Sequence, residues 1–264
     1  MSKQEILSFK NRYITYLKNN NGNCNICEWL ENAIDFESPD GYYFDENSRL
    51  LVIFEHFEID CSERPVNEKG KSLGSTRSKN FVDKHKEVQK EIQESDCDYY
   101  ESTKVVEQGY YKQDGNNRIY ELGKNGDKYR DNFIKNFYES FETNWKKIEK
   151  YKNNVIEKLG IQPLEFKVCF LVEDKTNGGT HYLENGIPSD KPVILTDALQ
   201  FQEKINNSKV DLVIYGQSDN NGIIGVGYKG DSVLNKIDLM KKEFFVLPSL
   251  PLFTFSKKTI INRK

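Results

Sequence analysis

Two nearly continuous apolar runs, Phe166 to Val172 and Val210 to Tyr215, constrain the fold more than any other feature of this sequence. Such runs are typical of strands that are buried on both faces of a sheet. Between them, residues 199–205 carry a helical pattern, and Thr196-Asp197 precedes it as an expected N-cap. Separated strands joined by helices favour a mixed sheet with helices on its faces.

A long helix is predicted before the first of these strands. Aromatic residues recur every four positions from Tyr129 to Trp145, apolar residues continue the stripe to Leu159, and Gly160 ends it. We interpret the aromatic face as core packing and not as a platform that stacks bases. Four side chains are expected to pack on the sheet: Phe133, Phe137, Phe141 and Trp145.

The N-terminal part predicts helices followed by a hairpin. Residues 3–19 have the periodicity of an amphipathic helix, and a shorter helix contains Trp29. Tyr42 to Phe44 and Leu50 to Ile59 are strand-like, and residues 45–48 supply the turn between them. The expected fold class is α/β, with a mixed central β-sheet, an N-terminal hairpin and flanking helices.

The chain is expected to form a single domain over residues 1–264. A β insertion is predicted at about residues 98–125, where Tyr110-Tyr111 and Ile119-Tyr120 flank the turn residues of a hairpin. Further elements expected are a helix over about residues 81–92 and a strand at 223–228.

Composition limits the classes of function. Aromatic residues make up 12% of the chain, which argues against disorder. The net charge of −3 gives no overall basic footprint for nucleic acid, although residues 61–80 carry a local excess of basic side chains. No stretch resembles a signal peptide or approaches the roughly 18 apolar residues of a membrane span, so a cytoplasmic location without membrane contact is expected. The five cysteines do not form a disulfide pattern.

Asp40 and Glu55 are the strongest candidates for chemistry. Asp40 stands before the first hairpin strand and Glu55 lies within the second, so the hairpin can bring the two carboxylates together. Carboxylate oxygens are ligands for Mg²⁺, and metal-dependent phosphodiester cleavage needs such ligands together with a positive charge near the phosphate. An acid inside an apolar strand also requires a partner or a metal, because burying an unpaired charge is costly.

Ser38-Pro39-Asp40, the hairpin, and the strand Val52-Ile53-Phe54-Glu55-His56-Phe57 resemble the PD-(D/E)xK nuclease superfamily, which includes restriction and repair endonucleases. The resemblance implies a restriction-endonuclease-like fold and Mg²⁺ or Mn²⁺ bound by Asp40 and Glu55. It also implies an acid from the preceding helix, Glu28 or Glu31. The implied activity is cleavage of phosphodiester bonds in nucleic acid, in a setting such as bacterial defence.

The motif departs from the superfamily at its lysine. Phe57 stands where that lysine belongs, because residues 55 and 57 share one face of a strand. Lys69 and Lys71 in the basic segment are the candidates to replace it, and His56 is a third, although it should face the other way. If none of them does, the chain is a non-catalytic binding protein that retains the fold.

Other interpretations stay open. The chain can instead be an unrelated α/β protein, and its partners can include a second copy of itself or another protein. Glu173-Asp174-Lys175 follows a buried strand and can contribute to a site. Cys24 and Cys27 have zinc-like spacing, but no second pair of ligands follows.

Overall fold

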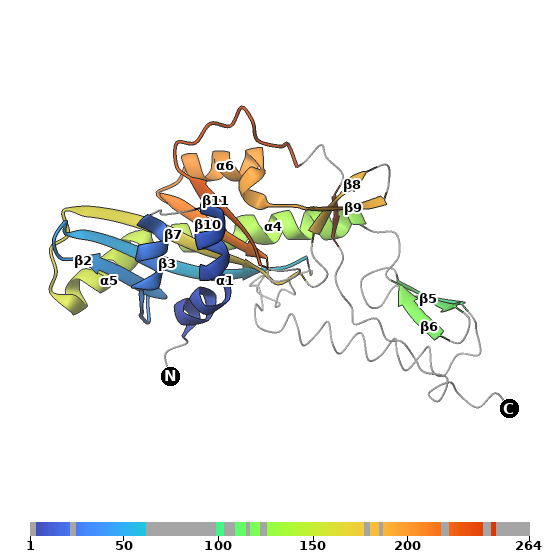
Figure 1. Ribbon diagram of the computed structural model, residues 1–264, viewed down its shortest axis with the longest axis horizontal. Coiled ribbons are helices and arrows are strands. Elements are labelled where there is room, and N and C mark those ends of the chain that lie inside the picture. The colour runs from blue at the N-terminus through green and yellow to red at the C-terminus, as the bar shows by residue number, and fades with distance from the viewer. Residues whose placement is uncertain are drawn as a thin grey trace, which may run out of the picture.

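A six-stranded mixed sheet forms the centre of the protein (Figure 1), with strand order β1-β2-β3-β7-β10-β11. The computed structural model describes residues 4–21, 25–61, 99–102, 109–114, 117–121, 126–176, 180–184, 187–217, 222–239 and 244–246. The strands of the sheet are β1 (Ile34–Asp35), β2 (Gly41–Asp45), β3 (Leu50–Ile59), β7 (Glu165–Asp174), β10 (Leu212–Gln217) and β11 (Ile223–Tyr228).

The register explains the mixed character of the sheet. β3, β7 and β10 run parallel, with Leu50 beside Glu165 and Ile59 beside Asp174 at the two ends of the β3–β7 pair. β1, β2 and β11 add antiparallel strands at the two edges. The predicted α/β class, mixed sheet and N-terminal hairpin are confirmed, and the two-residue strand β1 extends the hairpin to a three-stranded meander.

Helices cover both faces of the sheet, as the apolar runs predict. α1 (Glu5–Asn21) and α2 (Asn25–Glu31) share one hydrophobic cluster with β3, β7 and β10. α4 (Gly126–Trp145), α5 (Ile148–Leu159) and α6 (Leu199–Asn206) pack on the opposite face. The predicted core positions Phe133, Phe137 and Phe141 are buried there, whereas Trp145 is partly buried.

Two helix predictions are wrong in detail. The single helix expected up to Leu159 is divided, because α4 ends at Trp145 and α5 begins at Ile148. The break places Lys147 at the N-cap of α5. Thr196-Asp197 does not cap α6, since Leu195–Asp197 forms its own 3-10 turn (η2) and Ala198 is the N-cap, with no side-chain hydrogen bond.

Two smaller sheets complete the described strands. β4 (Tyr99–Ser102), β5 (Gly109–Asp114) and β6 (Asn117–Glu121) form one, and they include the hairpin predicted for this segment. β8 (Thr180–Glu184), β9 (Ile187–Pro192) and β12 (Phe244–Val246) form the other. The helix expected over residues 81–92 lies outside the described residues. Among those that are described, no helix is both long and apolar enough to cross a membrane.

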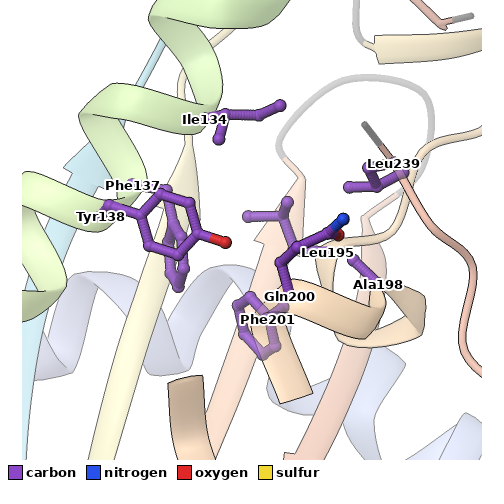
Figure 2. A pocket seen from close by; sticks show the side chains of 8 residues that line it. All are labelled: Ile134, Phe137, Tyr138, Leu195, Ala198, Gln200, Phe201 and Leu239. Carbon is purple, nitrogen blue, oxygen red and sulfur yellow. The ribbon is translucent and has the colours of Figure 1, made fainter. Parts of the chain in front are cut away.

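The contact between α4 and α6 is closely filled. Figure 2 shows Phe137 and Tyr138 from α4 facing Gln200 and Phe201 from α6 around a small cavity. The cavity measures about 20 Å³, which is room for about one water molecule. This face therefore offers no space for a substrate at that point.

Candidate active site

The hairpin brings Asp40 and Glu55 together where β2 begins beside β3. Gly41 pairs with Phe54 in the antiparallel register, and continuing that register by one residue places Asp40 beside Glu55. The two carboxyl groups interact, because Asp40 is one of the groups that raise the pKa of Glu55. The structure thus brings together the two acids that the sequence singled out.

A third acid, Glu5, reaches this pair from α1. A side chain at Gly41 would place its Cβ 2.5 Å from Cγ1 of Ile6, so only glycine lets α1 lie this close to β2. The N–H of Ile6 also donates to Oδ1 of Asp35 at 3.0 Å, which anchors the first turn of the helix. These contacts hold Glu5 where its carboxyl group hydrogen-bonds Asp40.

Asp40 is held by the backbone of the neighbouring strand. The N–H of His56 donates to its Oδ2 at 2.7 Å. Burial raises the pKa of Asp40 to about 6, and the hydrogen bond and charge of Glu5 add to this rise, while the His56 N–H opposes it. Near neutral pH the group therefore titrates, unlike an ordinary aspartate.

Glu55 is more deeply enclosed and is 7% exposed. The hydroxyl of Tyr151 on α5 donates to its Oε1 at 2.7 Å. Burial is the main cause that raises the pKa of Glu55 to about 8, and Asp40 adds to it, whereas Tyr151 and the charge of Lys147 lower it. Glu55 is therefore mostly protonated at pH 7 unless a cation binds it.

A second polar cluster lies beyond His56. Glu173 is 3% exposed, accepts a hydrogen bond from the Tyr13 hydroxyl at 3.1 Å, and pairs with Arg12 and with Lys175, whose Nζ lies at 2.8 Å. His56 Nδ1 lies 3.5 Å from Glu5, and its Nε2 lies 3.3 Å from Glu173 without hydrogen-bond geometry. His56 thus separates the Asp40 site from a buried carboxylate that has its own cations.

Asp174 has a structural role at the end of β7. Its Oδ2 accepts the Tyr215 hydroxyl at 2.6 Å, and its Oδ1 accepts the N–H of Thr176 at 2.8 Å. Both oxygens are therefore used by the protein. Of the three residues Glu173-Asp174-Lys175, none is joined directly to the Asp40–Glu55 pair by a described contact.

Several other sequence candidates lie elsewhere. Glu31 pairs with Lys18 at the surface, and Glu28 interacts with Tyr43. Phe57 shares the face of Glu55, as expected, and it packs against Phe170 with ring centroids 5.6 Å apart. Lys69, Lys71 and Cys24 lie outside the described residues.

The structure adds three residues that the sequence did not single out: Glu5, Lys147 and Tyr151. Glu5 looked like an ordinary acid in the first turn of a helix. Lys147 and Tyr151 were concealed because the segment was predicted as one continuous helix, with Tyr151 outside the aromatic stripe. The only sequence signal was that an acid within an apolar strand needs partners, and it does not say where those partners are.

The carboxylates of Asp40 and Glu55 are the groups that could bind a metal ion at this site. Within the described ranges, no group of three or more His, Cys, Asp or Glu side chains is arranged to hold a metal ion. Two interacting carboxylates still fit Mg²⁺, which keeps several waters and is commonly bound through one or two carboxylates. Repulsion between the two carboxylates also disfavours the state in which both are ionised, and a bound divalent cation would offset that repulsion.

No family model, no curated protein and no solved structure matches this chain. Fold and site define it as an α/β protein with a two-carboxylate centre, Asp40 and Glu55, between the start of β2 and the middle of β3 in a mixed sheet. Glu5, Tyr151 and Lys147 surround that centre.

The raised pKa of Glu55 predicts a distinct pH dependence of stability. Its folded pKa of about 8 exceeds the ordinary glutamate value of 4.5, so the folded state binds the proton more tightly. This stabilisation is complete below about pH 4.5 and is lost as pH rises through 8. As the pH rises from 5 to 8 without divalent cations, the unfolding free energy of the wild type should fall relative to that of Glu55→Gln. The expected fall is up to about 1.4 kcal/mol per pH unit. Urea unfolding of both proteins between pH 5 and 8 measures this, and a constant difference would contradict it.

Proposed function

We propose that the chain is a divergent, metal-dependent nuclease-like hydrolase that acts on phosphodiester bonds in nucleic acid. The observation that carries the proposal is the Asp40–Glu55 pair, in which two partly or fully buried acids interact across adjacent strands. Perturbed carboxyl groups that lie close together are a recurring property of catalytic sites. A role in bacterial defence belongs to the same proposal and depends on the superfamily resemblance alone.

The order of the elements supports this proposal. The resemblance to the PD-(D/E)xK superfamily implies a helix, a hairpin with a third strand, a helix and a further strand. The chain has α1, the meander β1-β2-β3, α4 with α5, and then β7 parallel to β3. Asp40 precedes β2 and Glu55 lies in β3, which are the places that the resemblance implies for the two metal ligands.

Asp40 and Glu55 would hold Mg²⁺ or Mn²⁺. When bound, such an ion polarises a phosphoryl oxygen and supplies activated water. Glu5 shares hydrogen bonding with Asp40 and therefore helps to set its charge, and the Tyr151 hydroxyl orients Glu55. Because Glu55 is mostly protonated near pH 7, loading the site requires the loss of its proton.

Lys147 is our candidate for the positive charge that Phe57 cannot provide. Its charge acts on Glu55, and its Nζ donates to Oδ1 of Asn144 at 3.1 Å at the break between α4 and α5. A lysine there can stabilise negative charge on a phosphate bound at the two carboxylates. Lys69 and Lys71, the candidates from the sequence, lie outside the described residues and remain candidates for the same role.

The test of the proposed function is a cleavage assay. Purified protein is incubated with single- and double-stranded DNA and RNA, with Mg²⁺, with Mn²⁺ or with a chelator. Cleavage that requires the divalent cation supports the proposal. Absence of cleavage on all four substrates, together with no Mg²⁺ or Mn²⁺ binding by calorimetry, would move the assignment to the non-catalytic alternative.

Lys147→Ala should reduce cleavage by about 10- to 100-fold, on the scale of losing a group that supports a metal centre. It should also raise the pKa of Glu55, since the charge of Lys147 lowers that pKa. Lys146→Ala is the matched control, because it removes the neighbouring exposed lysine. Equal activity of the two variants would remove Lys147 from the mechanism.

A non-catalytic binding protein is the second candidate. The burial of Phe57 against Phe170 at the lysine position favours it, because no cation can occupy that place. This alternative predicts binding of nucleic acid without cation-dependent cleavage, so the same assay separates the two functions when binding is measured in parallel.

A further inference from the structure

An open cleft of about 590 Å³ lies between α2 and the strands β7, β10 and β11. Sites for small ligands commonly have volumes of roughly 300–1,000 Å³. Eight residues line the cleft: Asn25, Ile26, Trp29, Lys167, Asp211, Leu212, Tyr228 and Lys229. None of them belongs to the Asp40–Glu55 site.

The cleft has an apolar and aromatic wall. Ile26, Trp29 and Leu212 are buried members of the cluster beneath α1 and α2, and Trp29 is 9% exposed. Tyr228, at the end of β11, lines the cleft and is 41% exposed. Walls of this kind accept a flat, partly apolar group such as a base.

Charged groups stand beside this wall. Nζ of Lys167 lies 5.2 Å from the centre of the Trp29 ring and 3.1 Å from Oε1 of the exposed Glu165, with which it forms a surface ion pair. Nζ of Lys229 donates to the backbone oxygen of Ser208 at 2.6 Å, which uses one of the three donors of an ammonium group. Oδ2 of Asp211 accepts the N–H of Val168 at 2.7 Å. Burial raises the pKa of Asp211, while this hydrogen bond and the charges of Lys229 and Lys167 lower it.

We propose that this cleft binds single-stranded nucleic acid, with a base against Tyr228 and the Trp29 wall and backbone phosphates on Lys167 and Lys229. Oδ1 of Asp211, whose Oδ2 already accepts the N–H of Val168, accepts a hydrogen bond from the amino group of a base. This inference names the substrate class of the proposed function and rests on it. Aromatic surfaces next to cations bind unpaired strands, whereas the bases of a duplex remain stacked inside it.

The cleft lies on the face of the sheet that α1 and α2 cover. Ile26, Trp29 and Leu212 share one hydrophobic cluster with Ile6, the residue that follows Glu5. The cleft and Glu5 therefore lie on the same face of the sheet.

Tryptophan fluorescence can report the cleft directly. The chain has two tryptophans, Trp29 in the cleft and Trp145 in α4 on the opposite face of the sheet. In the Trp145→Phe, Glu55→Gln protein, Trp29 is the only tryptophan, and hydrolysis is blocked. Titration with an oligothymidylate of about 12 nucleotides should quench this fluorescence saturably, because site sizes of roughly 4–16 nucleotides are usual. A labelled oligonucleotide followed by anisotropy should give the same affinity with Trp145 present.

Lys229→Ala should weaken this binding several-fold and lower the slope of log affinity against log salt by about one. Lys209→Ala is the control, because Lys209 is 60% exposed and pairs with Glu149 outside the cleft. A duplex of equal length should bind more weakly. No quenching, an equal effect of Lys209→Ala, or equal duplex affinity would overturn the inference. Cleavage without quenching would contradict only the binding role of the cleft. Quenching without cleavage would contradict only the proposed hydrolytic activity.

Discussion

Glu55→Gln should lower Mg²⁺-dependent cleavage by about 100-fold or more and leave the fold intact. Even the loss of a group that only supports a metal ligand costs about 10- to 100-fold, and Glu55 is proposed to be a ligand itself. Gln has the shape of a protonated Glu, which is the form that dominates at pH 7, since the pKa of Glu55 is about 8. The Tyr151 hydroxyl keeps an acceptor at 2.7 Å in the variant.

The matched control is Glu58→Gln. Glu58 lies three residues further along β3, is 58% exposed and faces Lys175 at 3.6 Å. It is the same change on the same strand, away from Asp40. Initial rates of cleavage should fall for Glu55→Gln alone. If both variants cleave like the wild type, Glu55 has no part in the reaction.

Phe137→Ala should reduce the free energy of unfolding by about 3–5 kcal/mol, the largest stability effect expected here. Phe137 is 2% exposed. Its ring centroid lies 4.8 Å from that of Phe201, on which it stacks, and 5.6 Å from that of Phe141. Removing the ring leaves a cavity between α4, α6 and the sheet that the rigid strands cannot fill. Urea unfolding followed by circular dichroism measures the change.

Leu234→Ala provides the comparison for this experiment. Leu234 is 89% exposed, so its replacement should change the unfolding free energy by less than about 0.5 kcal/mol. A loss below about 1 kcal/mol for Phe137→Ala would mean that α4 does not pack on the sheet as described.

The central fold was predictable because its apolar patterns are strong. The runs at 166–172 and 210–215 require burial on both faces, and the structure places β7 and β10 side by side with helices above and below. The division of α4 from α5 was not predictable in this way, because its apolar stripe continues across the break. The prediction of an N-cap at Thr196 was wrong because Leu195–Asp197 form a separate 3-10 turn.

Only the part of the site that is set by the pairing of the hairpin strands could be predicted from the sequence. A hairpin sets which residues of its two strands are neighbours, so Asp40 and Glu55 could be paired from the sequence. Glu5, Lys147 and Tyr151 arrive through tertiary packing. The close approach of α1 at Gly41 and the break before α5 decide their positions, and neither feature leaves a pattern in the surrounding sequence.

The claim that Asp40 and Glu55 share one cation is tested most directly by proton release on Mn²⁺ binding. Calorimetric titrations at pH 7 in buffers with different ionisation enthalpies give the number of protons released per ion. With the pKa of Glu55 at about 8, we expect close to one proton for the wild type. Glu55→Gln should bind more weakly and release far fewer. Tight Mn²⁺ binding without proton release, or with equal release by Glu55→Gln, would contradict a cation site at Asp40 and Glu55.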